Sequence, residues 1–250
     1  MKKLIALFLL ICLPANAAPD CQQLPDCEAY GYTCSADDCS GLKTLSCPFD
    51  ESKKICWPEA KECEVGSLLF DDLKCYDAAC GREPIAIVVN TDERIALQLA
   101  TPVSKVWSPL IVDVNGADDN CETEIATQTA LCRTDGKLNT KEIMEFAKAN
   151  PEHSFPAVEY CYTLTFGNQP EGSWYLPSFK ELYYVVENYP LIANIFTLRG
   201  LTFTNRYWWT STEYNETFAH WLNPTNGLCM QHNYGSSKSN SCSTTCMIRY

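Results

Sequence analysis

The clearest pattern of apolar and polar positions lies before residue 101, where two β-type runs follow each other. PIAIVV (84–89) and RIALQLA (94–100) are rich in aliphatic side chains, and the residues between them, Asn90 to Glu93, are turn formers. Two such runs joined by a short polar segment predict a β-hairpin. The following stretch, centred on residues 112–120, has the composition of a loop.

Residues 135–150 have the apolar spacing of a helix. Three apolar side chains fall on one face of that helix: Ile143, Phe146 and Ala147. We expect Asn139 or Thr140 to cap its N-terminus, because their side chains can accept a hydrogen bond from a free backbone N–H group.

A second helix is predicted over residues 177–189. Ser178 is placed at the N-cap and Glu181 follows three positions later, which is the spacing of a capping box. The apolar stripe consists of Leu182, Val185 and Val186. We expect Pro190 to end this helix.

The remainder of the chain is predicted to form short strands separated by turn residues, near residues 206–214, 218–223, 228–234 and 244–250. In the first of these strands, alternate residues point to opposite faces and both faces carry large aromatics, so Trp209 is expected in the core. A hairpin, two helices and then several antiparallel strands predict an α+β fold.

The first residues indicate export. A short basic start, MKK, precedes the apolar run LIALFLLICL, and Ala15-Asn16-Ala17 gives the small-residue pattern of a cleavage site. Residues 1–17 are therefore predicted to be a bacterial signal peptide. No later apolar run is long enough for a membrane helix, so we expect an exported protein at the cell surface, in the periplasm or outside the cell.

Cysteine usage agrees with an oxidising compartment. The chain has 16 cysteines, of which Cys12 lies in the leader, leaving 15 in the mature protein. An odd number leaves either one unpaired cysteine, most simply buried and inert, or one that links two chains into a disulfide-bonded oligomer.

Seven cysteines fall between residues 21 and 63, in a segment with few aliphatic residues. Such a segment buries little apolar surface, so residues 18–62 are predicted to form a small module held together by disulfides. Zinc is the alternative, but the spacing lacks paired C-x-x-C motifs and the segment contains no His.

The charge excludes several classes of partner. The formal net charge is −12, and removal of Lys2 and Lys3 with the leader would make it −14. Nucleic acids and anionic membranes recruit basic surfaces, so neither is an expected partner.

Four motifs carry a resemblance to a known family: DG-x-x-NT (135–140), GSWYLPSFKEL (172–182), YWWTSTEY (207–214) and HWL (220–222). Together they resemble a bacterial family of exported proteins typified by the C-terminal domain of a collagen-like adhesin, and the related Fibrobacter major paralogous domains. The resemblance implies a C-type lectin-like fold over residues 63–250. The chain departs from the family at its end, CMIRY, where an Arg-Pro-containing strand is common.

A C-type lectin-like fold implies calcium as a possible cofactor, because C-type lectins often bind it. Five oxygen-bearing side chains lie in one loop: Asp113, Asn115, Asp118, Asp119 and Asn120. Their spacing does not fit the helix-loop-helix calcium pattern, and the Glu-Pro-Asn and Gln-Pro-Asp motifs of sugar-binding lectins are absent. A solvated turn explains this loop as well, so no cofactor is predicted.

Catalysis finds little support. The chain has only His153, His220 and His232, and it contains neither GxSxG nor HExxH. Formylglycine-generating enzymes, which share the implied fold, use a redox cysteine pair near the C-terminus, and Cys242 and Cys246 invite that comparison. These cysteines could instead form a local structural disulfide, either between Cys242 and Cys246 or from Cys229 to one of them. We predict that the protein is not an enzyme.

The sequence therefore predicts non-covalent recognition of an extracellular glycan or protein, with adhesion as one form of it. The candidate binding residues lie on the loops and strand ends of the second half: Asn205, Arg206, Asn215, Glu216, His232 and Tyr234. Two alternatives are a structural envelope protein cross-linked through cysteines and an oxidoreductase of the formylglycine-generating type.

Overall fold

A computed structural model of the chain describes residues 42–47, 50–58, 60–76, 83–114, 135–203, 206–225 and 236–250. The chain divides into two compact units, the first comprising Met1–Glu62 and Lys74–Pro84, the second Cys63–Leu73 and Ile85–Tyr250. In the first unit, β1 (Leu42–Cys47) and β2 (Asp50–Pro58) pair as an antiparallel hairpin that the sequence analysis did not predict. Disulfide stapling of residues 18–62 stays a prediction.

The second unit mixes helices with two five-stranded sheets, which confirms the α+β class. One sheet has the order β3 (Leu68–Leu69), β4 (Ala86–Asn90), β5 (Ile95–Gln98), β12 (Met247–Arg249) and β7 (Trp174–Tyr175). The other has the order β10 (Ser236–Ser237), β9 (Phe218–Leu222), β8 (Trp208–Glu213), β11 (Ser241–Thr244) and β6 (Val103–Val106). The predicted hairpin is confirmed as the antiparallel pair β4–β5.

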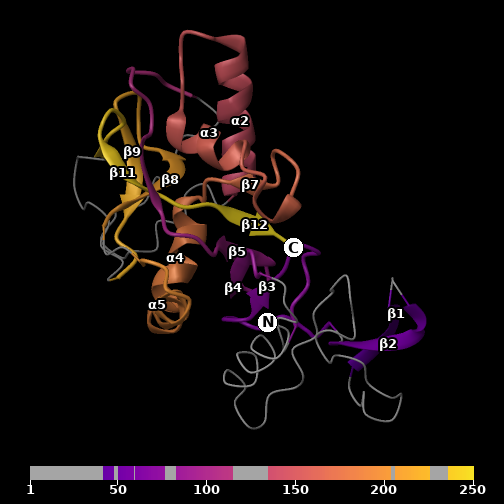
Figure 1. Ribbon diagram of the computed structural model, residues 1–250. Helices are drawn as coiled ribbons and strands as arrows, with labels where there is room; N and C mark the ends of the chain where they lie inside the picture. Colours follow the sequence, from indigo (N-terminus) through magenta and orange to yellow (C-terminus); the bar gives the residue numbers. More distant parts are fainter. Residues whose placement is uncertain are drawn as a thin grey trace, which may run out of the picture. The chain divides into compact units, whose positions relative to one another are not determined.

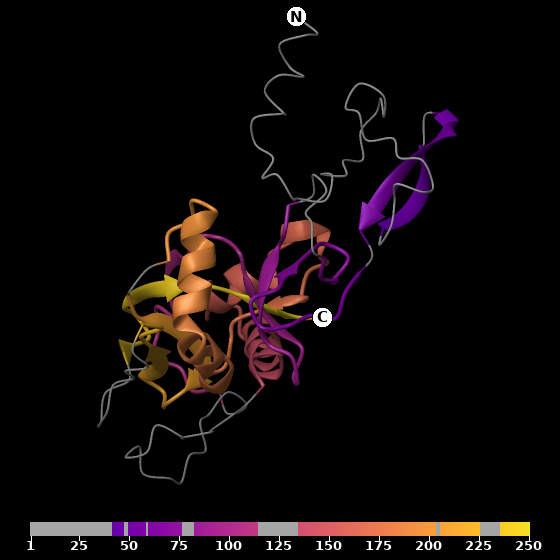
Figure 2. The same cartoon turned by 90° about the horizontal axis from the view of Figure 1, so that it is seen from below.

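The end of the chain belongs to both sheets. β11 pairs with β6 and β8, and β12, three residues further on, pairs with β5 and β7 in the other sheet. Both strands are drawn in yellow in Figures 1 and 2, where the chain runs from one sheet into the other. The β11–β8 pair is parallel, whereas the sequence analysis expected antiparallel strands throughout. The predicted strand near 228–234 lies outside the described residues.

Four α-helices are described in this unit: α2 (Gly136–Ala149), α3 (Pro156–Tyr162), α4 (Phe179–Glu187) and α5 (Tyr189–Leu198). The capping box of α4 is confirmed, since Ser178 and Glu181 each accept from the other's backbone N–H. The helix α4 ends at Glu187, before Pro190, as expected. The sequence did not predict the second helix α5, in whose first turn Pro190 lies and where a missing N–H costs nothing.

The N-cap predicted for the first helix was wrong. Asp135 caps α2, and its carboxylate accepts a hydrogen bond from the Leu138 N–H at 3.0 Å. Asn139 and Thr140 lie inside the helix, where they are buried and bond to other elements. Asp caps a helix as well as Asn or Thr, so the local sequence did not distinguish the positions.

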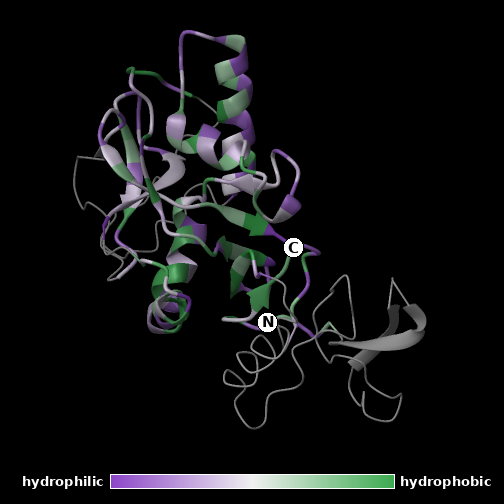
Figure 3. Cartoon of the chain, in the orientation of Figure 1, coloured by the Kyte–Doolittle hydropathy of each residue, from purple (hydrophilic) through white to green (hydrophobic). Residues whose placement is uncertain are grey.

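The main hydrophobic core lies between the first sheet and the helices α4 and α5. Strands β4 and β5 bury every side chain except Asn90, and Leu182, Val185, Ile192 and Phe196 cover them from the two helices. Figure 3 shows the strands β3 to β5 as mainly hydrophobic, while α2 alternates between hydrophobic and hydrophilic residues. Helices α2 and α4 each contact strands of both sheets.

A disulfide between Cys161 and Cys246 joins α3 to the residue that precedes β12. Both cysteines are fully buried. The expected local disulfide from Cys246 to Cys242 or Cys229 was therefore wrong, because Cys246 is bonded to a residue 85 positions away. The sequence offered no local signal for this pairing.

Replacement of both cysteines, C161A/C246A, is expected to lower the free energy of unfolding by about 4.6 kcal/mol, the chain-entropy value for a loop of this size. Urea denaturation followed by tryptophan fluorescence measures the change. A loss below about 1 kcal/mol would show that the terminal strand is held by its hydrogen bonds and packing alone.

Candidate functional site

Most aromatic residues of the signature motifs are core residues, whereas Tyr207 is 47% exposed. Trp174, Tyr175, Trp208 and Trp209 are fully buried, as predicted for Trp209, and each face of β8 is covered. The indole N–H groups of Trp174 and Trp209 donate to the carbonyls of Phe166 and Lys105, both at 3.0 Å. These side chains build the fold and are not available to stack on a ligand.

Three of the four motifs, at residues 135–140, 172–182 and 207–214, contact one another in the fold. The Ser211 N–H donates to the Pro177 carbonyl at 2.7 Å, and the Phe179 N–H donates to the Thr212 hydroxyl at 3.1 Å. The Asn139 amide of α2 donates to the Ser211 hydroxyl at 3.2 Å. Residues far apart in the sequence therefore form one polar layer between α2, α4 and β8.

Glu181 lies at the centre of this layer and is completely buried. Its Oε2 accepts from the N–H groups of Gly136 at 2.9 Å and Ser178 at 2.8 Å. Its Oε1 accepts from the Tyr175 hydroxyl and the Arg249 guanidinium, both at 3.2 Å. We call this set, together with Asp135, the Glu181 network.

Burial raises the pKa of the Glu181 carboxyl, and the hydrogen bonds from Ser178 and Gly136 and the charge of Arg249 offset part of that rise. The pKa of the Tyr175 hydroxyl is raised well above its usual value, first by burial and then by the neighbouring Glu181. Tyr175 therefore remains a proton donor to the carboxylate at all physiological pH values.

Arg249 links this network to the surface. Its guanidinium also pairs with Asp135 at 3.3 Å, so the terminal strand β12 is connected to the N-terminus of α2. The sequence analysis noted only that the chain's end departs from the family and assigned no role to Arg249. A salt bridge spanning more than one hundred residues leaves no local pattern from which to predict it.

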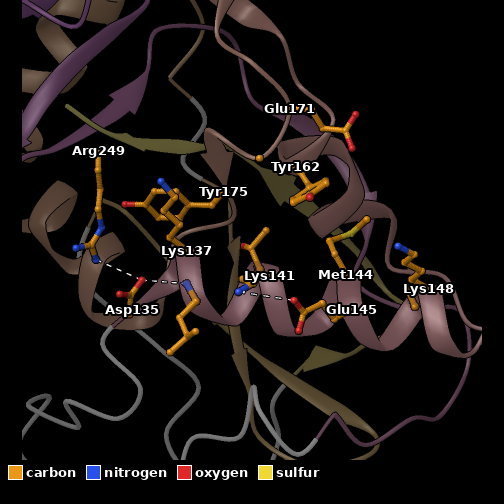
Figure 4. A pocket seen from close by; sticks show the side chains of 14 residues that line it. Asp135, Lys137, Lys141, Met144, Glu145, Lys148, Tyr162, Glu171, Tyr175 and Arg249 are labelled. Carbon is orange, nitrogen blue, oxygen red and sulfur yellow. Dashed lines mark hydrogen bonds and ion pairs between the residues drawn. The ribbon is translucent and has the colours of Figure 1, made fainter.

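A groove of about 910 Å³ runs along α2, and the Glu181 network forms one end of it. Figure 4 shows α2 as one wall, with Tyr162, Glu171 and Tyr175 facing it and Arg249 at the end. Gly172 in the opposite wall has a φ of +81°, and a Cβ there would lie 3.3 Å from the Tyr162 ring. Glycine thus allows the loop to lie flat against Tyr162.

The groove wall provided by α2 carries a stripe of four residues: Lys137, Lys141, Met144 and Lys148. At 3.6 residues per turn these four lie within about 60° of the helix circumference and extend over about 16 Å. Lys141 pairs with the exposed Glu145 at 3.7 Å. Lys137 and Lys148 have no ion-pair partner among the described residues.

Glu213, the acidic residue of the YWWTSTEY motif, is paired with Lys238 inside the fold. Glu213 forms a buried ion pair with Lys238, and its second oxygen accepts from the Val114 N–H at 2.9 Å. The Lys238 ammonium also donates to the carbonyls of Val112 and Glu216 at 2.5 and 3.2 Å. This pair fixes two loops to the end of β8.

The structure does not bring the predicted binding residues together. Arg206 is exposed before β8, whereas Asn215 and Glu216 lie in the turn after it, roughly 25 Å away along the strand. Asn215 uses its side-chain oxygen to accept from the N–H groups of Thr217 and Phe218, both at 2.9 Å. Asn205, His232 and Tyr234 lie outside the described residues. The binding role of all six stays a prediction.

The predicted calcium loop is described only at Asp113, which is exposed; Asn115, Asp118, Asp119 and Asn120 lie outside the described residues. Within the described ranges, no three His, Cys, Asp or Glu side chains are grouped so that they could hold a metal ion. Among the same residues, none of the helices combines the length and apolar character needed to cross a membrane.

Comparison with known proteins gives a likeness of fold. No family model and no curated protein matches the chain, so the resemblance to the collagen-like adhesin family and the C-type lectin-like fold stays a hypothesis. Among solved structures, a fimbrial protein from Bacteroides ovatus ATCC 8483 is similar, with a TM-score of 0.54 and 13% sequence identity. The match covers 79% of this chain and 59% of that one.

Loss of the Glu181 carboxylate would leave the Gly136 and Ser178 N–H groups and the Tyr175 hydroxyl without this acceptor, and would remove one of the two carboxylates that pair with Arg249. We expect E181A to lower the free energy of unfolding by about 3–5 kcal/mol, as for removal of one member of a buried charge pair. E187A, on an exposed position of the same helix, is the control and should change it by less than about 0.5 kcal/mol. Equal effects in chemical denaturation would contradict this role.

A second charged group joins the β4–β5 turn to α4. Glu93 accepts from the Lys180 ammonium at 2.5 Å and from the Tyr184 hydroxyl at 2.7 Å. Burial alone would raise the pKa of the Glu93 carboxyl, but these two hydrogen bonds outweigh it and the pKa is lowered below 4.5.

A lowered pKa in the folded state means that this stabilisation is present above pH 4.5 and is lost as the pH falls through the folded-state value. We therefore expect the stability difference between wild type and E93Q to shrink on acidification below that pH. Thermal unfolding of both proteins across the acid range measures it. A difference that stays constant with pH would be inconsistent with the pair.

Proposed function

We propose that the protein is an exported bacterial surface or secreted protein that recognises an extracellular glycan or protein without catalysis, and that the groove along α2 is its ligand site. The observation that carries the proposal is the groove itself, a concave surface about 16 Å long with a mixed cationic and apolar wall.

The lining of the groove favours binding over chemistry. Its described lining contains no His, Cys or Ser. The hydroxyl of Thr140 is engaged with the backbone of Leu176, donating to the carbonyl and accepting from the N–H at 3.1 Å. Tyr175 and Arg249 are committed to the Glu181 carboxylate. No activated nucleophile and general base face each other among these residues.

Export is supported by the leader-like start and by the buried Cys161–Cys246 disulfide, which is typical of an oxidising compartment. The fold likeness to a Bacteroides ovatus fimbrial protein agrees with a bacterial surface role. The same likeness is compatible with a structural role in the cell envelope, which is the second candidate function and which the odd number of cysteines in the mature chain suggested.

Recognition is tested by screening the mature protein on a glycan array and on immobilised extracellular matrix proteins. We expect binding in at least one screen, and A147W, which fills the groove, is expected to weaken that binding at least tenfold. A193W makes the same change on α5, outside the groove, and serves as the matched control.

Three results would overturn the proposal. Absence of wild-type binding in both screens would reject recognition and favour the structural role. Binding that survives A147W would reject the groove as the site. A loss in A193W equal to that in A147W, with both variants folded by circular dichroism, would likewise reject it, because the effect would not depend on the groove.

A further inference from the structure

The groove presents a positive stripe on a strongly acidic protein. Lys137, Lys141 and Lys148 follow one another along α2 with Met144 between them, while the whole chain carries a formal charge of −12. A local charge opposite to the net charge attracts acidic groups at short range. The occupant of the groove is therefore expected to be acidic.

Arg249 does not supply a further free charge at the groove end. It pairs with Asp135 and Glu181 at 3.3 and 3.2 Å, so two carboxylates already surround it. Glu145 pairs with Lys141, and Glu171 in the opposite wall adds one negative charge, so the positive charges that remain for a ligand are those of Lys137 and Lys148. A ligand must reach both ends of the stripe, which requires an elongated molecule.

Of the two tyrosines in the groove, Tyr175 cannot stack on a sugar ring. Tyr175 is completely buried and its hydroxyl is bonded to Glu181. The edge of the Tyr162 ring packs against Gly172. The apolar contacts on offer are instead Met144 and Leu138, which is 43% exposed. Methionine and leucine suit the side chains of a peptide and adapt to different sequences.

The spacing also suits a peptide. Lys137 and Lys141 are separated by about 6 Å along the helix axis, close to the distance of about 7 Å between alternate residues of an extended strand. An extended peptide of about five residues spans the stripe. Acidic residues at alternate positions would face the lysines, and the apolar residues between them would point to the opposite wall of the groove, where Tyr162 lies.

We propose that the groove along α2 binds an extended acidic segment of a partner protein, with acidic and apolar residues interspersed. This inference rests on the proposed recognition function and specifies its ligand class. Electrostatic attraction makes such binding sensitive to salt, since the screening length falls from about 30 Å at 10 mM to about 8 Å at 150 mM ionic strength.

The test measures fluorescence anisotropy of a labelled peptide of roughly eight residues, with alternating Glu and Leu, added to the mature protein. We expect binding that weakens with salt and that falls at least tenfold in K137E/K148E. K61E/R199E makes the same change in charge at exposed positions outside the groove and is expected to bind like wild type. A peptide with alternating Lys and Leu is expected not to bind.

Several outcomes would overturn the inference. Unchanged binding in K137E/K148E, or loss only in K61E/R199E, would place the site elsewhere. Equal binding of the Lys-Leu peptide would show that the site does not select for acidic side chains. Tighter groove-dependent binding of polygalacturonate would make the ligand a glycan. Self-association of the wild type that K137E/K148E abolishes would make a second copy the occupant. Absence of peptide binding with a positive array screen would reject this inference alone and leave recognition intact.

Discussion

The second unit depends on one buried carboxylate. Four donors from separate parts of the chain point at Glu181: two backbone N–H groups, a tyrosine hydroxyl and an arginine. A buried carboxylate costs several kcal/mol unless its partners are all in place. The ends of α2 and α4 and the strands β7 and β12 must therefore assemble together. Gly136 belongs to the same constraint, since a Cβ at that position would overlap Glu181 and the Ser178 backbone.

Local patterns predicted some of this arrangement. Turn formers between two aliphatic runs identified the β4–β5 hairpin, and the spacing of Ser178 and Glu181 identified the start of α4. Strand parity placed Trp209 in the core correctly. Each of these depends on neighbours within a few residues, which is the range over which sequence periodicity carries information.

The remaining features depend on contacts between distant residues. Arg249 is 68 positions from Glu181, and Cys246 is 85 from Cys161, so neither pairing leaves a local trace. The same holds for the groove, which joins one face of α2 to a loop, to β7 and to β12. The candidate ligand contacts Arg206, Asn215 and Glu216 are separated by the fold along β8, and no local pattern in the sequence pointed to the exposed face of α2.

None of the four stripe residues on α2 is a specified position of the signature motifs, although the motifs supply other residues of the groove. The buried polar and aromatic side chains of the motifs satisfy one another inside the fold, whereas Lys137, Lys141, Met144 and Lys148 lie on the outer face of α2. The scaffold thus presents a helix whose exposed face is independent of the packing below it. Recognition on such a face depends on residues that the motifs leave unconstrained.

The central claim, that one carboxylate holds these elements together, is tested most directly by amide hydrogen exchange observed by NMR at Gly136 and Ser178. Both N–H groups donate to Glu181 Oε2, although neither lies in regular helical or strand pairing. The account predicts that both exchange only through unfolding of the whole unit, with protection free energies near the global value. Exchange at either amide close to the rate of an unstructured peptide would contradict it.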